Sequence, residues 1–383
     1  MRRKGKILLL WGMLFFVLVP GTARGDQDEK EETYWQEELA EYDLSSFDQV
    51  LEEVLPQSAL TFSQVMEILI QGDTQAGWQA LAYYMEHLLW GEWHLGKTVA
   101  WNVLLVGILG AVFTNLARAF PDGGVAQSGF VVFYVTVAAL LLQGMTGALT
   151  IAMDGLEVIG TLMTAFCPVF FLVVAIQGQL TAAAMYEMAL VLVQGVGWIC
   201  RHGILSGIRL WVLLRLVEGL FTEPMWEHLG RMLGKGIRKI LRVSFGAVIG
   251  FQAIQALLLP YLDGVKNGAL WKVASAIPGV GNGVRTAAQL ALGTAALLRN
   301  AMGMGGVVVL VAAALPSLMK LLSLGCLYHG LATLLQPITD RRIVSAVAAA
   351  GEGCLLLCRV LSMGVLLFGI FIGIVCACFG RAV

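Results

Sequence analysis

The chain has 383 residues, of which 58% are hydrophobic and 13% charged, and its mean hydropathy is +0.78. Water-soluble domains carry about 25% charged residues, so this composition excludes an ordinary soluble protein. The net charge of −1 hides an uneven distribution, because residues 26–97 hold 16 of the 26 acidic residues and only two lysines. An acidic region of this kind argues against nucleic acid as a partner. We therefore predict an all-α, polytopic helical membrane protein.

Residues 1–25 have the parts of a secretory signal peptide. A basic start at residues 2–6 precedes an apolar run from Ile7 to Val19, and small residues follow at Gly21 and Ala23, as a cleavage site requires. An uncleaved membrane anchor is the alternative. In both cases the basic end stays in the cytosol, so the residues that follow are exported.

Residues 26–97 are predicted to form a small exported helical head. After a charged start, apolar residues recur at helical spacing in three stretches, near 47–55, 62–69 and 78–90. Such amphipathic helices pack against one another or lie on a membrane surface. The tryptophans near residues 90–101 suit the interface between lipid and water, where the first span begins.

Residues 91–98 match the phosphate-binding pattern G-x-x-x-x-G-K-T letter for letter. The chemistry of that pattern needs a buried strand before the loop and a soluble helix after it, so that backbone N–H groups surround the phosphates. Here an amphipathic helix precedes the pattern and a membrane span follows it. We therefore do not predict nucleotide binding.

Residues 98–383 are predicted to form a multi-span membrane domain. Their apolar runs approach the ~20 residues that cross a bilayer, and counted as crossings they give about seven to eight spans. The runs are Val99–Leu116, Phe130–Leu149, Val158–Ile176, Ala182–Cys200, Arg201–Leu220, Val243–Leu259, Gly303–Leu322 and Ile343–Phe379. The count depends on residues 201–220 crossing the membrane despite their charges.

The segment from Leu229 to Arg242 is basic and amphipathic. Its apolar positions lie on one helical face and its five lysines and arginines on the other. A helix of this kind is typical of a cytosolic membrane surface. With the head outside, this placement puts Arg341 and Arg342 in the cytosol as well, as the excess of positive charge in cytosolic loops requires.

Residues 277–306 are predicted to be a glycine-rich irregular segment, which opens with Pro278-Gly-Val-Gly-Asn-Gly283. Glycines let helices approach one another closely in lipid. Non-helical backbone at membrane depth occurs only where protein or a water-filled cavity covers it. We therefore place this segment inside the bundle.

Two groups of residues are the candidate functional residues: polar residues in apolar runs, where each charge costs about 2.5–3.5 kcal/mol to place in a membrane, and residues of the glycine-rich segment. We interpret them as facing the bundle interior or lining a passage. They are Arg209, Arg215, Glu218, Pro278, Gly279, Gly281, Asn282, Gly283, Arg299 and Asn300. For Arg215 and Glu218 an internal ion pair at i, i+3 is the alternative.

No catalytic pattern is present in the sequence. HExxH, GxSxG and paired membrane aspartates are all missing, so we predict no enzyme activity, no cofactor and no metal site. The seven cysteines lie in apolar stretches without a CxxC pair and are interpreted as small helix-facing or lipid-facing residues. Three GxxxG pairs, at 203/207, 246/250 and 369/373, predict close helix packing.

The chain resembles the stage III sporulation protein AE family of endospore-forming bacteria. The matching features are Ile277-Pro-Gly-Val-Gly281, the small-residue helix up to Leu298, Arg299-Asn-Ala301, and the glycine-rich span that ends at Leu315-Pro316 with Lys320. The layout of signal peptide, exported head and many spans also matches.

The resemblance implies a multi-pass protein of the mother-cell membrane, with its head outside the cytosol. It implies membership of a channel-like complex that joins mother cell and forespore, with other membrane proteins of that complex and a forespore protein across the intermembrane space as partners. Our leading hypothesis is a membrane subunit of this trans-envelope transport or secretion complex. The alternatives are a non-transporting membrane scaffold for that complex and a stand-alone permease.

Overall fold

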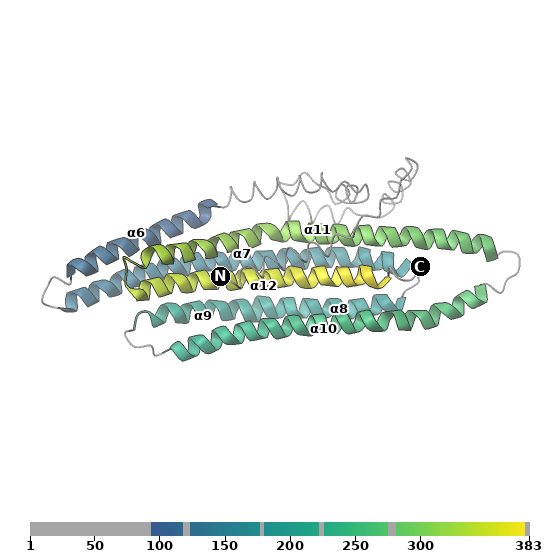
Figure 1. The fold of residues 1–383 in the computed structure, drawn as a ribbon, viewed down its shortest axis with the longest axis horizontal. Coiled ribbons are helices and arrows are strands. Elements are labelled where there is room, and N and C mark those ends of the chain that lie inside the picture. Colours follow the sequence, from purple (N-terminus) through teal and green to yellow (C-terminus); the bar gives the residue numbers. More distant parts are fainter. Residues whose placement is uncertain (1–92, 118–122, 177–179, 222–225, 275–280, 380–383) are drawn as a thin grey trace.

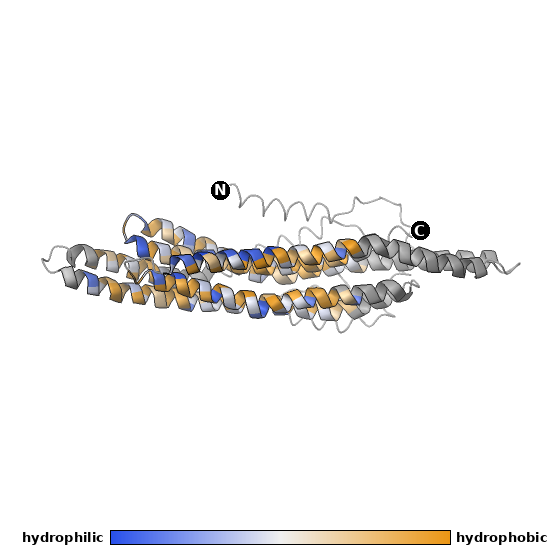
Figure 2. Cartoon of the chain, turned by 90° about the horizontal axis from the view of Figure 1, so that it is seen from below, coloured by the Kyte–Doolittle hydropathy of each residue, from blue (hydrophilic) through white to orange (hydrophobic). Residues whose placement is uncertain are grey.

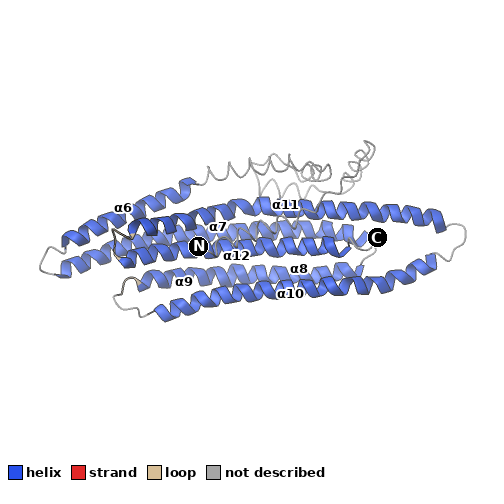
Figure 3. Ribbon diagram, viewed as in Figure 1, coloured by secondary structure: helices blue, strands red, loops and turns tan. Residues whose placement is uncertain are grey.

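The computed structural model describes residues 93–117, 123–176, 180–221, 226–274 and 281–379. This part of the chain consists of helices and short turns, without a strand (Figure 3). The all-helical prediction is confirmed for it. The predicted signal peptide, nearly all of the predicted head, and the beginning of the phosphate-loop pattern lie outside the described residues.

The helices run lengthwise beside one another in an elongated bundle (Figure 1). In chain order they are α6 (Trp93–Ala117), α7 (Gly123–Ile176), α8 (Leu180–Ile199), the π-helical turn η1 (Cys200–Ile204), α9 (Leu205–Glu218), α10 (Glu227–Ala274), α11 (Gly281–Leu335) and α12 (Arg341–Phe379). Helix α12 contacts α7, α8, α9, α10 and α11, so it lies at the centre of the bundle. Figure 1 shows α10 along one edge and α6 and α11 along the opposite edge.

Large aromatic and aliphatic side chains fill the core between α7, α11 and α12. Tyr134, Phe166, Tyr328, Phe368 and Phe371 are among the largest fully buried side chains. Phe166 of α7 meets Phe368 of α12 edge to face, with ring centroids 6.1 Å apart, a geometry that aromatic pairs favour. The buried faces of α7 and α11 therefore pack against α12.

The helices are longer than the predicted spans. Helix α7 has 54 residues and joins the predicted spans 130–149 and 158–176. Helix α10 has 48 residues and joins the basic segment 229–242 to the predicted span 243–259. At 1.5 Å per residue, a helix of this length extends over about 70–80 Å, more than twice the ~30 Å of a hydrocarbon core.

Four helical stretches of the described residues are long and apolar enough to cross a membrane. They are Gln127–Cys167, Leu190–Glu218, Met302–Leu335 and Arg341–Ile374. The predicted count of about seven to eight spans is not confirmed. The predicted spans 130–149 and 158–176 merge, because the residues between them, Asp154-Gly-Leu-Glu157 included, contain no proline and an α-helix continues through them.

The irregular backbone expected over 277–306 is not observed from Gly281 onward, where α11 begins. Residues 275–280 lie outside the described part. Helix α11 also continues through Pro316. In an apolar environment every backbone group needs a partner within the protein, and this requirement outweighs the ~1 kcal/mol helix penalty of each glycine.

The basic segment of α10 packs on the bundle, which differs from the predicted position flat on a membrane. Ile237 and Leu241 are each 4% exposed. Trp211 of α9 donates a hydrogen bond from its indole nitrogen to the Gly230 carbonyl oxygen over 2.9 Å. Gly207 lies where α9 and α10 meet, since a Cβ there would be 3.5 Å from Ile237 Cγ1. The close packing predicted for the pairs 246/250 and 369/373 is not observed among the described residues, because nothing lies within 4 Å of a Cβ at those four glycines.

Candidate functional site

Arg215 and Glu218 form an ion pair within α9. Arg215 Nη1 lies 3.3 Å from Glu218 Oε2, and the two side chains are 31% and 16% exposed. The Arg215 guanidinium carbon is also 6.0 Å from the centre of the Trp211 ring. This geometry is the i, i+3 pairing considered from the sequence as the alternative to a passage. Arg209, on the same helix, is exposed on the bundle surface.

The remaining predicted site residues belong to the N-terminal half of α11 or precede it. Pro278 and Gly279 lie outside the described residues. Gly281, Asn282 and Gly283 form the first turn of α11, and its later turns include Arg299 and Asn300. The structure describes the backbone of these residues but not their side chains, so it does not bring them together with Arg215 and Glu218.

Ionisable residues from five elements gather at one cross-section of the bundle. We call this set the charged belt: Asp154 and Glu157 of α7, Arg201 of η1, Arg242 of α10, Lys320 of α11 and Arg359 of α12. Contacts between residues close to them in the sequence show that these elements meet at the same height along the bundle. A methyl group placed on Gly155 would lie 2.9 Å from Ser317 Cβ and 3.0 Å from Leu361 Cδ1. Arg201 and Leu241, the neighbour of Arg242, line one cavity with Leu156, which places η1 and α10 at the same level.

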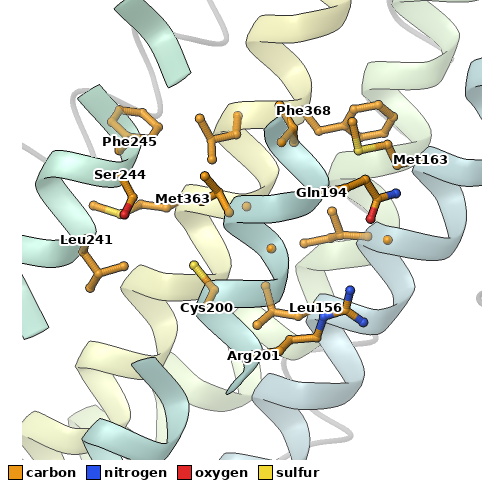
Figure 4. A pocket seen from close by; sticks show the side chains of 17 residues that line it. Leu156, Met163, Gln194, Cys200, Arg201, Leu241, Ser244, Phe245, Met363 and Phe368 are labelled. Carbon is orange, nitrogen blue, oxygen red and sulfur yellow. The ribbon is translucent and has the colours of Figure 1, made fainter. Parts of the chain in front are cut away.

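A small cavity lies at the level of the charged belt (Figure 4). Residues of α7, α8, η1, α10 and α12 line it, among them Leu156, Arg201, Leu241 and Met363. Its volume is about 50 Å³. That volume accommodates about three water molecules, whereas sites for organic ligands measure about 300–1,000 Å³.

Arg201 contributes a charged group to this mostly apolar cavity. It follows the first residue of the π-helical turn η1, and such turns occur often at functional positions. Its Nε is buried and has no hydrogen-bond partner among the described residues. Gln194 and Ser244 also line the cavity, so water held there would meet more than one polar group.

One face of α7 is polar and points away from the bundle. We call it the α7 outer face, and its exposed members are Gln143, Thr146, Thr150, Asp154, Glu157, Thr161 and Thr164. They recur every three or four residues, which places them on one side of a helix. The buried residues Met145, Ala148, Ala152 and Ile159 lie on the other side.

The threonines and the carboxylates of the α7 outer face differ in their hydrogen bonding. Thr146, Thr150 and Thr164 each donate to a carbonyl oxygen of their own helix at 2.7–3.1 Å. Asp154 and Glu157 have no ion-pair partner among the described residues. A bare carboxylate facing lipid is costly, so these two groups require a polar neighbour beyond the described residues.

A basic face runs along the first half of α10. We call it the α10 basic face, and it consists of the exposed residues Arg231, Lys235, Arg238 and Arg242. Figure 2 shows hydrophilic residues gathered on the first half of this helix and hydrophobic ones after them. Arg231 pairs with Glu227 at 3.4 Å. Lys235, Arg238 and Arg242 have no ion-pair partner in the described ranges.

The sequence alone did not indicate the charged belt. Asp154, Glu157, Arg359 and the basic residues of α10 were visible as charges within or beside apolar runs. Their common height in the bundle depends on the axial offset between packed helices, which cannot be read from residue spacing. The fixed three-to-four-residue period of the α7 outer face was the available signal.

Comparisons with known proteins match nearly the whole chain. The sequence profile of the family described as Stage III sporulation protein AE (spore_III_AE) matches residues 60–378. The Stage III sporulation protein AE of Bacillus subtilis (strain 168) is 22% identical over 357 residues, which cover 92% of this chain and 86% of that protein. No solved structure matches the chain. The profile match includes all residues of the charged belt.

Proposed function

Because the chain belongs to the stage III sporulation protein AE family, which implies a role in sporulation, we propose that it is a membrane subunit of a channel-like transport or secretion complex. In this proposal it is a multi-pass protein of the mother-cell membrane, non-enzymatic, with its N-terminal head outside the cytosol. The complex links mother cell and forespore, and other membrane proteins of the complex are its partners.

The observation that carries the proposal is the exposure of two carboxylates within an apolar helix, without an ion-pair partner among the described residues. Asp154 and Glu157 are exposed on α7, within its candidate membrane span Gln127–Cys167. Lipid tails cannot solvate these groups. Neighbouring proteins or a water-filled space between subunits can, and this is the environment of a multi-subunit membrane assembly.

The described cavity favours a role within a complex over a stand-alone permease. At about 50 Å³ it holds a few water molecules and no organic solute. We place a passage for larger cargo between chains, because this cavity of the described residues has no room for it. The scaffold alternative shares this assembly and differs only in whether anything moves through it.

The experiment compares sporulating cells that carry the wild-type chain or D154N/E157Q, with T146V/T150V on the same α7 outer face as the matched control. Neutral amides keep the size of the carboxylates and remove their charge. We expect normal protein levels, retained partners on affinity purification, and loss of tracer movement between mother cell and forespore for D154N/E157Q only.

Loss of the partners together with tracer movement would favour the scaffold. Unchanged tracer movement and spore yield with D154N/E157Q would contradict the proposed role of the belt. Transport by the purified wild-type chain alone in vesicles would favour the permease instead.

A further inference from the structure

We propose that copies of this chain assemble side by side into a closed ring, with the α7 outer face of one copy against the α10 basic face of the next. The contact pairs Asp154 with Arg238 and Glu157 with Arg242 of the neighbouring copy. This inference concerns self-association and goes beyond the proposed transport, because a ring can form whether or not anything passes through it.

The two faces lie at the same level of the bundle. Leu156 of α7, Met363 of α12 and Leu241 of α10 line one cavity, so Glu157 and Arg242 are level with each other. Further along the bundle, a methyl group on Gly353 would meet both Val212 of α9 and Met145 of α7.

Helices α7 and α10 are also level at a second place, further from the cavity. Trp211, which precedes Val212 in α9, bonds the Gly230 carbonyl of α10 over 2.9 Å. Met145 and Gly230 are therefore near one level. The acidic and the basic face extend over the same part of the bundle.

The two faces also run in the same direction with a similar repeat. Figure 1 shows α7 and α10 both running from the end that holds the α9–α10 turn toward the opposite end. Asp154 and Glu157 are about 4.5 Å apart along their helix axis, and Arg238 and Arg242 about 6 Å. Flexible arginine side chains cover that difference, so both pairs can form at once.

Insertion into the membrane limits which faces of two copies can meet. All copies enter the bilayer with one orientation and one depth, so only faces at equal level within the chain can meet between copies. Helix α12 separates α7 from α10, which leaves the two faces on different sides of the bundle. A contact between two different faces repeats from copy to copy at constant depth, and it closes into a ring where the angle between the two faces brings the last copy back to the first.

A second copy fits these observations better than another partner. The acidic pair and the basic pair are opposite in charge, equal in level and parallel within one chain. An anionic lipid surface would account for the α10 basic face but leave Asp154 and Glu157 without a partner. A different protein would account for either face but not for their shared level.

The test measures the mass of the full-length protein in detergent and in lipid nanodiscs, with charge-reversed variants. D154R/E157R reverses the α7 outer face, and R238E/R242E reverses the α10 basic face. We expect an oligomer for the wild type and self-association at least about tenfold weaker for each variant, since each close ion pair contributes about 1.5 kcal/mol or more. R359E, another exposed belt residue on neither face, is the control and keeps the wild-type mass.

Co-expression of the two variants with different affinity tags is the decisive measurement. A copy with two basic faces and a copy with two acidic faces complement each other, so a mixed oligomer of both tags is expected, while neither variant alone assembles. The chain that carries all four substitutions also assembles again. Helix content and the thermal transition of each variant show that it is folded.

A wild-type monomer in native membranes and nanodiscs would overturn the inference, as would oligomers that neither reversal weakens. Folded variants that do not restore each other would overturn it too. Weaker binding of R238E/R242E to anionic vesicles without any self-association of the wild type would assign the basic face to lipid. An oligomer that forms normally in cells without tracer movement would count against the proposed transport and leave the ring intact.

Discussion

Tyr134 of α7 donates a hydrogen bond from its hydroxyl to the carbonyl oxygen of Leu216 over 2.6 Å, in the buried interior. Leu216 lies in the last turn of α9, where carbonyl groups have no partner within the helix. Gly219, three residues later, lacks a side chain where a Cβ would collide with the Tyr134 ring. One side chain therefore terminates α9 and ties it to α7, far away in the sequence.

Replacing Tyr134 with phenylalanine removes this hydrogen bond and keeps the ring. The Leu216 carbonyl then stays buried without its partner, which costs about 1–3 kcal/mol. We expect a lower thermal transition of the purified protein in detergent, measured by circular dichroism. T136V on the same helix is the control, because the Thr136 hydroxyl bonds only the Val132 carbonyl of its own helix at 2.9 Å. Equal transitions for both variants would show that the contact contributes nothing.

Two glycines of α11 should respond to alanine in opposite directions. At Gly306 a Cβ would lie 2.5 Å from Phe166 Cε2, and Phe166 is itself buried, so overpacking costs about 1–3 kcal/mol. At Gly330 nothing lies within 4 Å, and alanine there gains up to ~1 kcal/mol of helix propensity. G306A should therefore lower the thermal transition and G330A should keep or raise it. A transition raised by G306A would show that α7 and α11 do not meet in this register.

Substitutions at Arg215 and Glu218 distinguish a structural role of this ion pair from a role in lining a passage. The pair is only partly exposed, so E218Q should cost about 1 kcal/mol of stability, near the upper end of what accessible ion pairs contribute. The double reversal R215E/E218R should recover part of that loss, because it restores opposite charges at i, i+3. If E218Q leaves stability unchanged but abolishes spore formation, the pair acts on a transported species rather than on the fold.

The sequence predicted more of the fold than of the candidate site. Composition and the apolar runs predicted the helical membrane class, and the ion pair of Arg215 and Glu218 followed from their spacing. The predicted division into spans 182–200 and 201–220 was wrong for the described residues, because helix continues through the π-helical turn η1 and Leu190–Glu218 is one candidate span. Periodicity cannot decide whether a helix bends back or continues, because charges such as Asp154 and Glu157 are compatible with both. The charged belt depends on the packing level of five elements, which only the tertiary structure supplies.

The continuous helix α10 makes the topology testable with two positions. Lys235 and Asp263 are 28 residues apart in one helix, or about 42 Å at 1.5 Å per residue, which exceeds the ~30 Å hydrocarbon core. Because basic residues gather before position 243 and an apolar run follows, we expect Lys235 in the cytosol and Asp263 on the opposite side. A membrane-impermeant thiol reagent applied from outside should label D263C and not K235C, with the unsubstituted chain giving the background of its own cysteines. Labelling of K235C alone would invert the proposed orientation, and equal labelling of both would mean that α10 does not cross the membrane between them.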